Sequence, residues 1–117
     1  MTLEEVAART YRTDETRALD GKFSSLLDLD QKVTFYLGKL EYEDVGLALL
    51  RRARELGFFV GVTRDYLERS AHMTGSTYKS MMLSYRYIAV AGNINGVEVI
   101  IPTEKMLQNK PTVKKQS

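Results

Sequence analysis

The pair Asn95 and Gly96 constrains the fold of this 117-residue chain more than any other local feature. A two-residue type I′ turn needs a positive φ at both positions, which asparagine and glycine tolerate better than other residues. Placing the turn there opposes Ile94 with Val97, Gly92 with Val99, Val90 with Ile101, and Asn93 with Glu98. Apolar residues then meet on one face, so turn chemistry and register agree. The sequence therefore predicts a C-terminal β-hairpin.

A well-patterned helix is predicted over residues 43–57. Its apolar positions recur at helical spacing, at Val45, Leu49, Ala53 and Leu56. Acidic residues stand at the start and arginines in the second half, as the helix dipole favours, and Gly57 follows as a glycine cap. The aromatic and β-branched run at 58–62 then predicts a strand.

Two shorter helices are predicted next, each begun by a threonine N-cap. Thr63 starts the first, which runs to Arg69 or Ala71, and Thr74 starts the second, which runs to about residue 84. In the second helix, a buried face is expected at Tyr78, Met81, Met82 and Tyr85. After the hairpin, Pro102 ends the strand and Thr103 caps a last turn that contains Met106 and Leu107.

The N-terminal part is predicted to be helical as well. Thr2 and Glu5 form a capping box for a first helix, and residues 12–22 are expected to be a linker or a frayed helix. A second amphipathic helix is predicted from the spacing of Leu26, Leu29, Val33, Tyr36, Leu37 and Leu40. Such a stripe needs a partner, either the rest of the chain or a second copy, and we expect a homodimer through residues 23–40. The expected organisation is N-terminal helices at 1–42, a domain at 43–108 and a basic flexible tail at 109–117.

Composition argues against several classes of protein. No apolar run approaches the ~20 residues that cross a bilayer, and the N-terminus lacks a secretory signal, so we expect a cytoplasmic protein without membrane contact. The chain has no cysteine and a single histidine, His72, and no activated nucleophile or carboxylate pair stands out. We therefore expect no catalytic residues, no metal site and no cofactor, and a binding protein in place of an enzyme.

Charge is distributed unevenly along the chain. Residues 1–44 contain six Lys/Arg and ten Asp/Glu, a net charge of −4, whereas residues 45–117 contain eleven and five, a net charge of +6. A basic half attracts a phosphate backbone, because neutralising phosphates releases condensed counterions. A dipolar protein without a nucleic-acid partner explains the same pattern.

The predicted order over residues 43–101, which is helix, short strand, helix, turn, helix and hairpin, resembles the winged helix-turn-helix superfamily. The core positions of such a motif are occupied by Leu67, Ala71, Met73, Tyr78 and Met81. Two residues depart from the pattern: Glu68 stands where a small residue is usual, and His72 where the tight turn usually has glycine. The expected fold class is mainly α with a small β component (α+β), with a winged helix-turn-helix core, a C-terminal β-hairpin and additional N-terminal helices.

The resemblance implies DNA binding, with helix 74–84 entering a groove, and a role as a small transcriptional regulator or replication-associated factor. The candidate contact residues are Arg64, Arg69, Ser76, Thr77, Lys79, Ser80, Arg86, Lys110, Lys114 and Lys115. The outward face of helix 74–84 carries no arginine, asparagine or glutamine for a bidentate base contact, so it suits phosphate positioning better than stringent base recognition. Tyr78, Tyr85 and Tyr87 can stack on bases, and burial behind the hairpin explains them equally well. The alternative function is a protein-binding adaptor or inhibitor that docks through its acidic N-terminal half.

Overall fold

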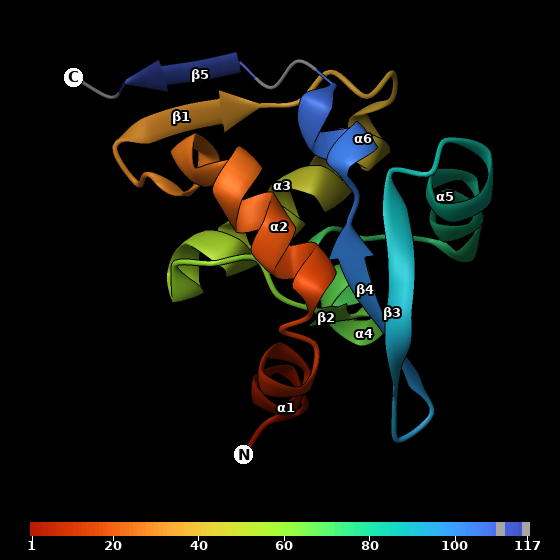
Figure 1. The fold of residues 1–117 in the computed structure, drawn as a ribbon. Coiled ribbons are helices and arrows are strands. Elements are labelled where there is room, and N and C mark those ends of the chain that lie inside the picture. The colour runs from red at the N-terminus through yellow and green to blue at the C-terminus, as the bar shows by residue number, and fades with distance from the viewer. Residues whose placement is uncertain (110–111, 116–117) are drawn as a thin grey trace.

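The computed structural model describes residues 1–109 and 112–115, and these form a mixed α+β structure, as predicted (Figure 1). The N-terminal elements are α1 (Leu3–Thr10), α2 (Asp14–Lys22), a 3-10 turn η1 (Ser24–Leu27), β1 (Gln31–Thr34) and α3 (Leu40–Leu56). They are followed by β2 (Val62–Thr63), α4 (Arg64–Ser70), α5 (Gly75–Lys79), a π-helical turn η2 (Ser80–Ser84), β3 (Ile88–Ile94), β4 (Val97–Pro102), α6 (Glu104–Gln108) and β5 (Thr112–Lys115).

A three-stranded antiparallel sheet has the order β2–β4–β3, so the short strand β2 pairs with the second strand of the hairpin. The predicted turn is confirmed, with φ of 51° at Asn95 and 82° at Gly96. The predicted register is confirmed from the turn as far as Gly92, which lies opposite Val99. Beyond that point a bulge between Val90 and Gly92 shifts the pairing, and Val90 lies opposite Ile100. The predicted pair Val90 and Ile101 is therefore wrong, because the bulge leaves one extra residue on β3.

Helix α3 confirms the apolar stripe predicted for residues 43–57. Val45, Leu49 and Ala53 are buried, and Gly57 ends the helix with a φ of 87°. The strand predicted over 58–62 forms only at Val62–Thr63. Phe59 is buried, but its backbone bonds to side chains: its N–H donates to Asp20 at 2.7 Å, and its carbonyl accepts from Arg12 at 3.3 Å. These bonds replace the partner strand that a longer β2 would need.

The helix predicted from the 26–40 stripe is wrong. Burial alternates from Val33 to Leu37, with Val33, Phe35 and Leu37 buried and Tyr36 exposed, which is the two-residue period of extended chain. Gly38, with a φ of 95°, separates this segment from α3. Of the predicted stripe, Leu26, Val33 and Leu37 are buried in their own chain, whereas Leu29, Tyr36 and Leu40 are exposed. The amphipathic helix on which the expected homodimer through residues 23–40 was based therefore does not form.

Two further segments, one near each terminus, can be compared with the prediction. Of the two alternatives for residues 12–22, a linker or a frayed helix, a helix forms: α2, which Thr13 caps by accepting from the N–H of Thr16. The tail was expected to be mobile, yet Thr112–Lys115 pairs with Gln31–Thr34 as an antiparallel ladder. Residues 110–111 and 116–117 lie outside the described part of the chain.

The N-terminal elements pack onto the same body as the sheet. Leu19 and Leu26 belong to one apolar cluster with residues of α3, α4 and β4. Glu4 of α1 accepts hydrogen bonds from the N–H and the hydroxyl of Thr63, at the start of α4. The Tyr11 hydroxyl reaches β3, where it accepts from the N–H of Asn93 at 3.1 Å. Of the helices described here, none has the length and apolar content to cross a bilayer.

Candidate nucleic-acid interface

Helices α4 and α5 are joined by a tight turn whose shape depends on His72. Each helix has the predicted cap: the Thr63 hydroxyl accepts from the N–H of Tyr66 at 3.1 Å, and the Thr74 hydroxyl accepts from that of Thr77 at 3.2 Å. Between them, His72 has a φ of 53°. This is the left-handed conformation that glycine adopts most easily. His72, which stands where a glycine was expected in sequence, therefore adopts a backbone conformation that favours glycine.

The helix that follows has one buried and one exposed side. Tyr78 and Met81 are buried, as predicted, whereas Met82, which was expected on the same buried face, is only partly buried. On the other side Ser76 and Lys79 are exposed and Ser80 is half-buried. Figure 1 shows α5 beside β3, on the side of that strand opposite α3. The Ser76 hydroxyl and the Lys79 ammonium group are thus presented to solvent, and Ser80 is presented in part.

Thr77 does not belong to that exposed face. Its side chain is only 9% exposed, and its hydroxyl accepts from the hydroxyl of Thr74 at 3.1 Å. Thr77 was expected at the flank of the contact surface. Its position three residues after the cap turns it inward, where it completes the N-terminal turn of α5.

Arg64 is engaged within the protein. Its Nη1 donates to Glu98 of β4 at 2.9 Å, its Nε lies 3.4 Å from Glu68, and its guanidinium lies 4.3 Å from the centre of the Tyr78 ring. The Tyr78 hydroxyl donates to the second oxygen of Glu98. Arg64, Tyr78 and Glu98 therefore fasten α4, α5 and the hairpin together, and we call these three residues the buckle.

The electrostatics of the buckle follow from these contacts. Hydrogen bonds from Tyr78 and then from Arg64 lower the pKa of Glu98, because both stabilise the carboxylate. Burial, followed by the hydrogen bond to Glu98, raises the pKa of the Tyr78 hydroxyl. The hydrogen bond to Glu98 also raises the pKa of Arg64, because it stabilises the charged guanidinium.

A shallow hollow of about 200 Å³ lies between α4 and the hairpin turn. Its charged lining residues are Arg64, Asp65, Glu68 and Glu98, so carboxylates outnumber the cation. Such a lining repels phosphate.

The remaining predicted contact residues divide into three groups. Arg69 pairs with Asp65 at 3.2 Å on the exposed side of α4. Arg86 is exposed with a φ of 56°, and the Thr103 hydroxyl donates to its carbonyl at 2.7 Å, which fixes the backbone at the base of the hairpin. Lys110 lies outside the described residues, and the side chains of Lys114 and Lys115 lie outside them as well, although both residues belong to β5.

Three tyrosines form a cluster where α3, η2 and β3 meet. The Tyr85 and Tyr87 rings are stacked with centroids 5.3 Å apart, and Tyr42 lies 5.4 Å from Tyr85. Tyr87 and Tyr78 are buried, so burial accounts for both, whereas Tyr85 remains 41% exposed. Tyr85 was expected on the buried face of its helix. The π-helical turn before it changes the helical phase and leaves the ring at the surface.

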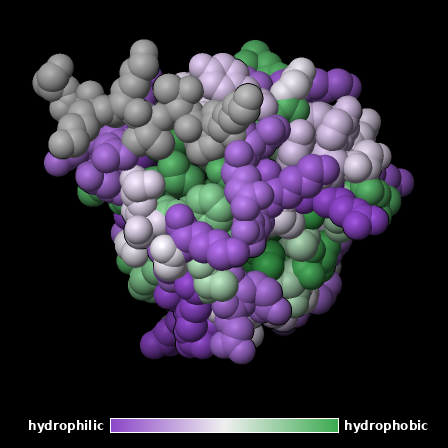
Figure 2. Space-filling view, turned by 45° about the horizontal axis from the view of Figure 1, so that its top comes forward, coloured by the Kyte–Doolittle hydropathy of each residue, from purple (hydrophilic) through white to green (hydrophobic). Residues whose placement is uncertain are grey.

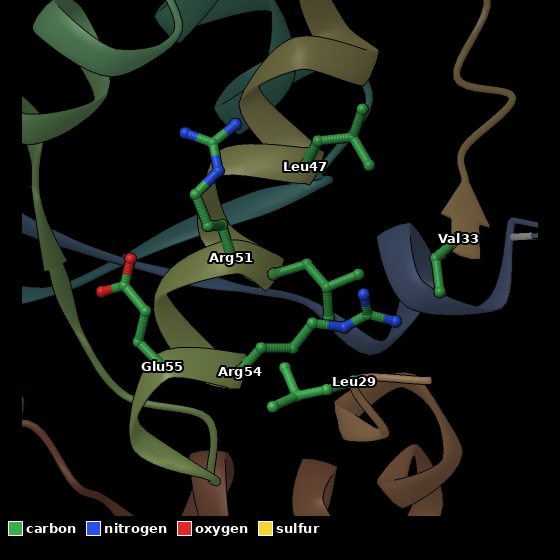
Figure 3. A pocket seen from close by; sticks show the side chains of 7 residues that line it. Leu29, Val33, Leu47, Arg51, Arg54 and Glu55 are labelled. Carbon is green, nitrogen blue, oxygen red and sulfur yellow. The ribbon is translucent and has the colours of Figure 1, made fainter. Parts of the chain in front are cut away.

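Two larger hollows lie on either side of α3. The first has a volume of about 550 Å³, and Figure 3 shows Leu29, Val33 and Leu47 around it, with Arg51, Arg54 and Glu55 along the helix. The Arg54 guanidinium crosses from α3 to donate to the carbonyls of Leu26 at 2.7 Å and Gln31 at 2.8 Å. This hollow is thus framed by a segment that Arg54 holds in place.

The second hollow has a volume of about 560 Å³, and four arginines line it: Arg9, Arg12, Arg17 and Arg52. Sequence analysis did not select these residues. The available signal was the presence of three arginines within nine positions of an otherwise acidic N-terminal segment, but nothing in the sequence placed them beside Arg52.

The exposed large apolar side chains are spread along the chain, most of them outside the helices and strands. They are Met1, Leu29, Tyr36, Leu40, Phe58, Leu83, Tyr85 and Val90. On the face that Figure 2 shows, hydrophobic residues appear in several separate areas with hydrophilic residues between them. Within the described part of the chain, no three His, Cys, Asp or Glu side chains gather as a metal site.

Comparison of the chain with protein-family models, with curated proteins and with solved structures found no match. The function proposed below is therefore based on the geometry of the chain's own residues.

Proposed function

We propose that residues 43–101 form a winged helix-turn-helix unit that binds double-stranded DNA. The element order α3, β2, α4, α5, β3, β4 supports this proposal, as does the strand order β2–β4–β3, in which the short strand joins the hairpin. The observation that carries the proposal is the α4–α5 pair: a left-handed residue, His72, joins the two helices, and the second helix has its outer side exposed.

The contacts proposed are few and are directed mainly at the backbone. Lys79 supplies a charge on the exposed side of α5, and Ser76 and Ser80 supply hydroxyls that donate to phosphate oxygens. Arg86 adds a second exposed cation beyond the end of the helix. Lys79 and Arg86 have no ion pair within the described part of the chain, unlike Arg64 and Arg69.

This arrangement suits a protein that binds DNA with little sequence discrimination. Bidentate recognition of guanine or adenine uses Arg, Asn or Gln, and α5 with η2 contains none of these. A small regulator or a replication-associated factor that positions itself through phosphate contacts fits such a surface.

The test is fluorescence anisotropy with a labelled duplex of mixed sequence at low ionic strength. We expect saturable binding, and we expect the double variant Lys79→Ala/Arg86→Gln to weaken it by about tenfold or more, because charge-assisted contacts to phosphate are lost. Arg51→Gln is the matched control, because it removes an exposed arginine from α3, next to the apolar hollow. Absence of binding by the folded protein, or equal affinity of the double variant and the control, would overturn the proposal.

The acidic hollow between α4 and the hairpin favours a second function, in which the same unit docks on a protein. Asp65, Glu68 and Glu98 line this hollow with a single arginine, so it fits a basic side chain of a partner better than a phosphate. A pulldown from nuclease-treated extract separates the two functions. Retention of one stoichiometric protein that Glu68→Gln releases supports docking, whereas partners that disappear with nuclease treatment contradict it.

A further inference from the structure

The hollow lined by four arginines lies between α1, the start of α2 and the last turns of α3. Its volume of about 560 Å³ lies in the range of small-molecule sites in proteins. The arginines converge from segments far apart in sequence, with Arg52 on α3 and the other three between positions 9 and 17.

The wall of this hollow is positively charged. Glu5 is the one carboxylate among its lining residues, and it is occupied by the capping box with Thr2. Carboxylates do pair with some of the arginines: Arg12 pairs with Asp20, and Arg52 lies 3.2 Å from Glu55. Arg17 lies 3.5 Å from Asp14 as well, but Asp14, Asp20 and Glu55 are not among the residues that line the hollow, whereas all four arginines are.

Two donor groups of the arginines that line the hollow have no strong acceptor among the described residues. The Nε of Arg52 is buried and has no acceptor within the described part of the chain. The Nη1 of Arg9 lies 3.7 Å from the sulfur of Met1, a weak acceptor, and the Arg9 side chain is exposed. Among the described residues, the Arg9 guanidinium therefore has only a weak acceptor, and the Arg52 guanidinium, which donates through Nη1 to Glu55, has an unused donor at Nε.

The hollow also has an apolar side. Phe58 is 36% exposed and lines it, together with Leu56 and Ala8. The Arg12 guanidinium lies 4.6 Å from the centre of the Phe58 ring, so a planar cation and an aromatic ring stand next to each other. Both groups stack on flat rings.

We propose that this hollow binds a nucleotide, with its phosphates on the arginines and its base against Phe58. Several guanidinium groups around one space match a ligand that carries two or more negative charges, and the fork of each guanidinium fits two phosphate oxygens. The aromatic wall distinguishes a nucleotide from inorganic phosphate or polyphosphate. This site is separate from the proposed DNA contacts of Lys79 and Arg86, which do not line the hollow.

Equilibrium dialysis of the full chain with ATP, inorganic triphosphate and adenosine tests this proposal. We expect one ATP per chain, and we expect triphosphate and adenosine each to bind about tenfold or more weakly, because each lacks half of the recognised groups. Arg9→Gln and Arg52→Gln should each weaken ATP binding by about tenfold, since a charge-assisted contact is lost. Arg51→Gln is the neighbouring control and should leave ATP binding unchanged, as should Lys79→Ala/Arg86→Gln.

Absence of ATP binding at millimolar concentration overturns the proposal, and so does equal affinity of Arg9→Gln and Arg51→Gln. Equal binding of triphosphate and ATP overturns the role of Phe58 and hence the assignment to a nucleotide. If Arg52→Gln lowers the melting temperature, Arg9→Gln decides the question, because Arg9 lies at the surface. A loss of DNA binding with intact ATP binding identifies failure of the earlier proposal alone.

Discussion

Replacing Gly92 with alanine should destabilise the protein by forcing Tyr11 out of its place on the hairpin. A Cβ at position 92 would lie 2.2 Å from the Tyr11 hydroxyl oxygen and 2.4 Å from Cε1 of the ring. Nonbonded heavy atoms prefer separations of about 3.5–4.0 Å, so the ring has to move by more than about 1 Å.

That movement has two costs. Overpacking a close contact costs about 1–3 kcal/mol. The Tyr11 hydroxyl also loses its contacts with Asn93, whose N–H donates to it at 3.1 Å and whose carbonyl accepts from it at 3.2 Å. These two bonds are solvent-accessible and together contribute about 1 kcal/mol. We therefore expect Gly92→Ala to lower the free energy of unfolding by about 2–4 kcal/mol.

Urea denaturation followed by circular dichroism measures this change, and a double-mutant cycle with Tyr11→Ala isolates its cause. In the Tyr11→Ala background the ring is absent, so Gly92→Ala should cost less than about 0.5 kcal/mol. Gly21→Ala in α2 is the control, because nothing lies within 4 Å of its added Cβ. It should stabilise the helix by about 0.5–1 kcal/mol. Equal costs of Gly92→Ala in both backgrounds would show that the ring is not responsible.

Three further changes test other parts of the fold. His72→Gly should raise the free energy of unfolding by about 0.5–1 kcal/mol, because His72 has a φ of 53°, which glycine adopts without strain. Ala71→Gly is the control and should lower the free energy of unfolding. Thermal unfolding of the two variants measures the difference. Glu98→Gln should make the free energy of unfolding less dependent on pH under acidic conditions. The lowered pKa of Glu98 stabilises the fold at higher pH, and this contribution is lost as the pH falls below the usual value of 4.5. In that range the urea midpoint of the wild type should therefore drop more steeply than that of the variant. Arg54→Met should lower the free energy of unfolding by about 1–3 kcal/mol, because two backbone carbonyls lose their charged donor. Amide exchange should become faster in β1 and stay unchanged in β4. Arg51→Met is the control, and equal exchange rates in β1 for the two variants would contradict the role of Arg54.

The elements that the sequence predicted correctly are those fixed by local chemistry. Thr63, Thr74 and Thr103 cap helices because each hydroxyl accepts from an N–H three residues ahead, and that geometry does not depend on the rest of the fold. The turn at Asn95 and Gly96 is local in the same sense. The exposure of Ser76 and Lys79 could be predicted as well, because the helical period alone separates them from Tyr78 and Met81.

The sequence-based predictions are wrong where contacts with residues far away in the sequence determine the local structure. Val33 and Leu37 fit both a helical spacing of four and an extended spacing of two, and Val33 lies in β1, which pairs with Thr112–Lys115. Arg64 was assigned to phosphate because its partner Glu98 lies thirty-four residues away and could not be located from sequence. The arginine hollow was missed for the same reason, since α1 and α3 meet only in the folded chain.

Because Arg64 is bonded within the buckle, we expect it not to contact phosphate, and the number of remaining cations predicts how DNA affinity depends on salt. Each phosphate contact contributes about −0.9 to the slope of log affinity against log salt concentration. The two exposed cations of the proposed interface, Lys79 and Arg86, thus give a slope of about −1.8, and Lys79→Ala/Arg86→Gln should remove most of it. Anisotropy titrations at several salt concentrations measure the slope. A wild-type slope steeper than about −4 would refute this account, because it requires more phosphate contacts than α5 and Arg86 can supply. Repeating the titration with Arg52→Gln would then show whether the arginine hollow holds the additional phosphates.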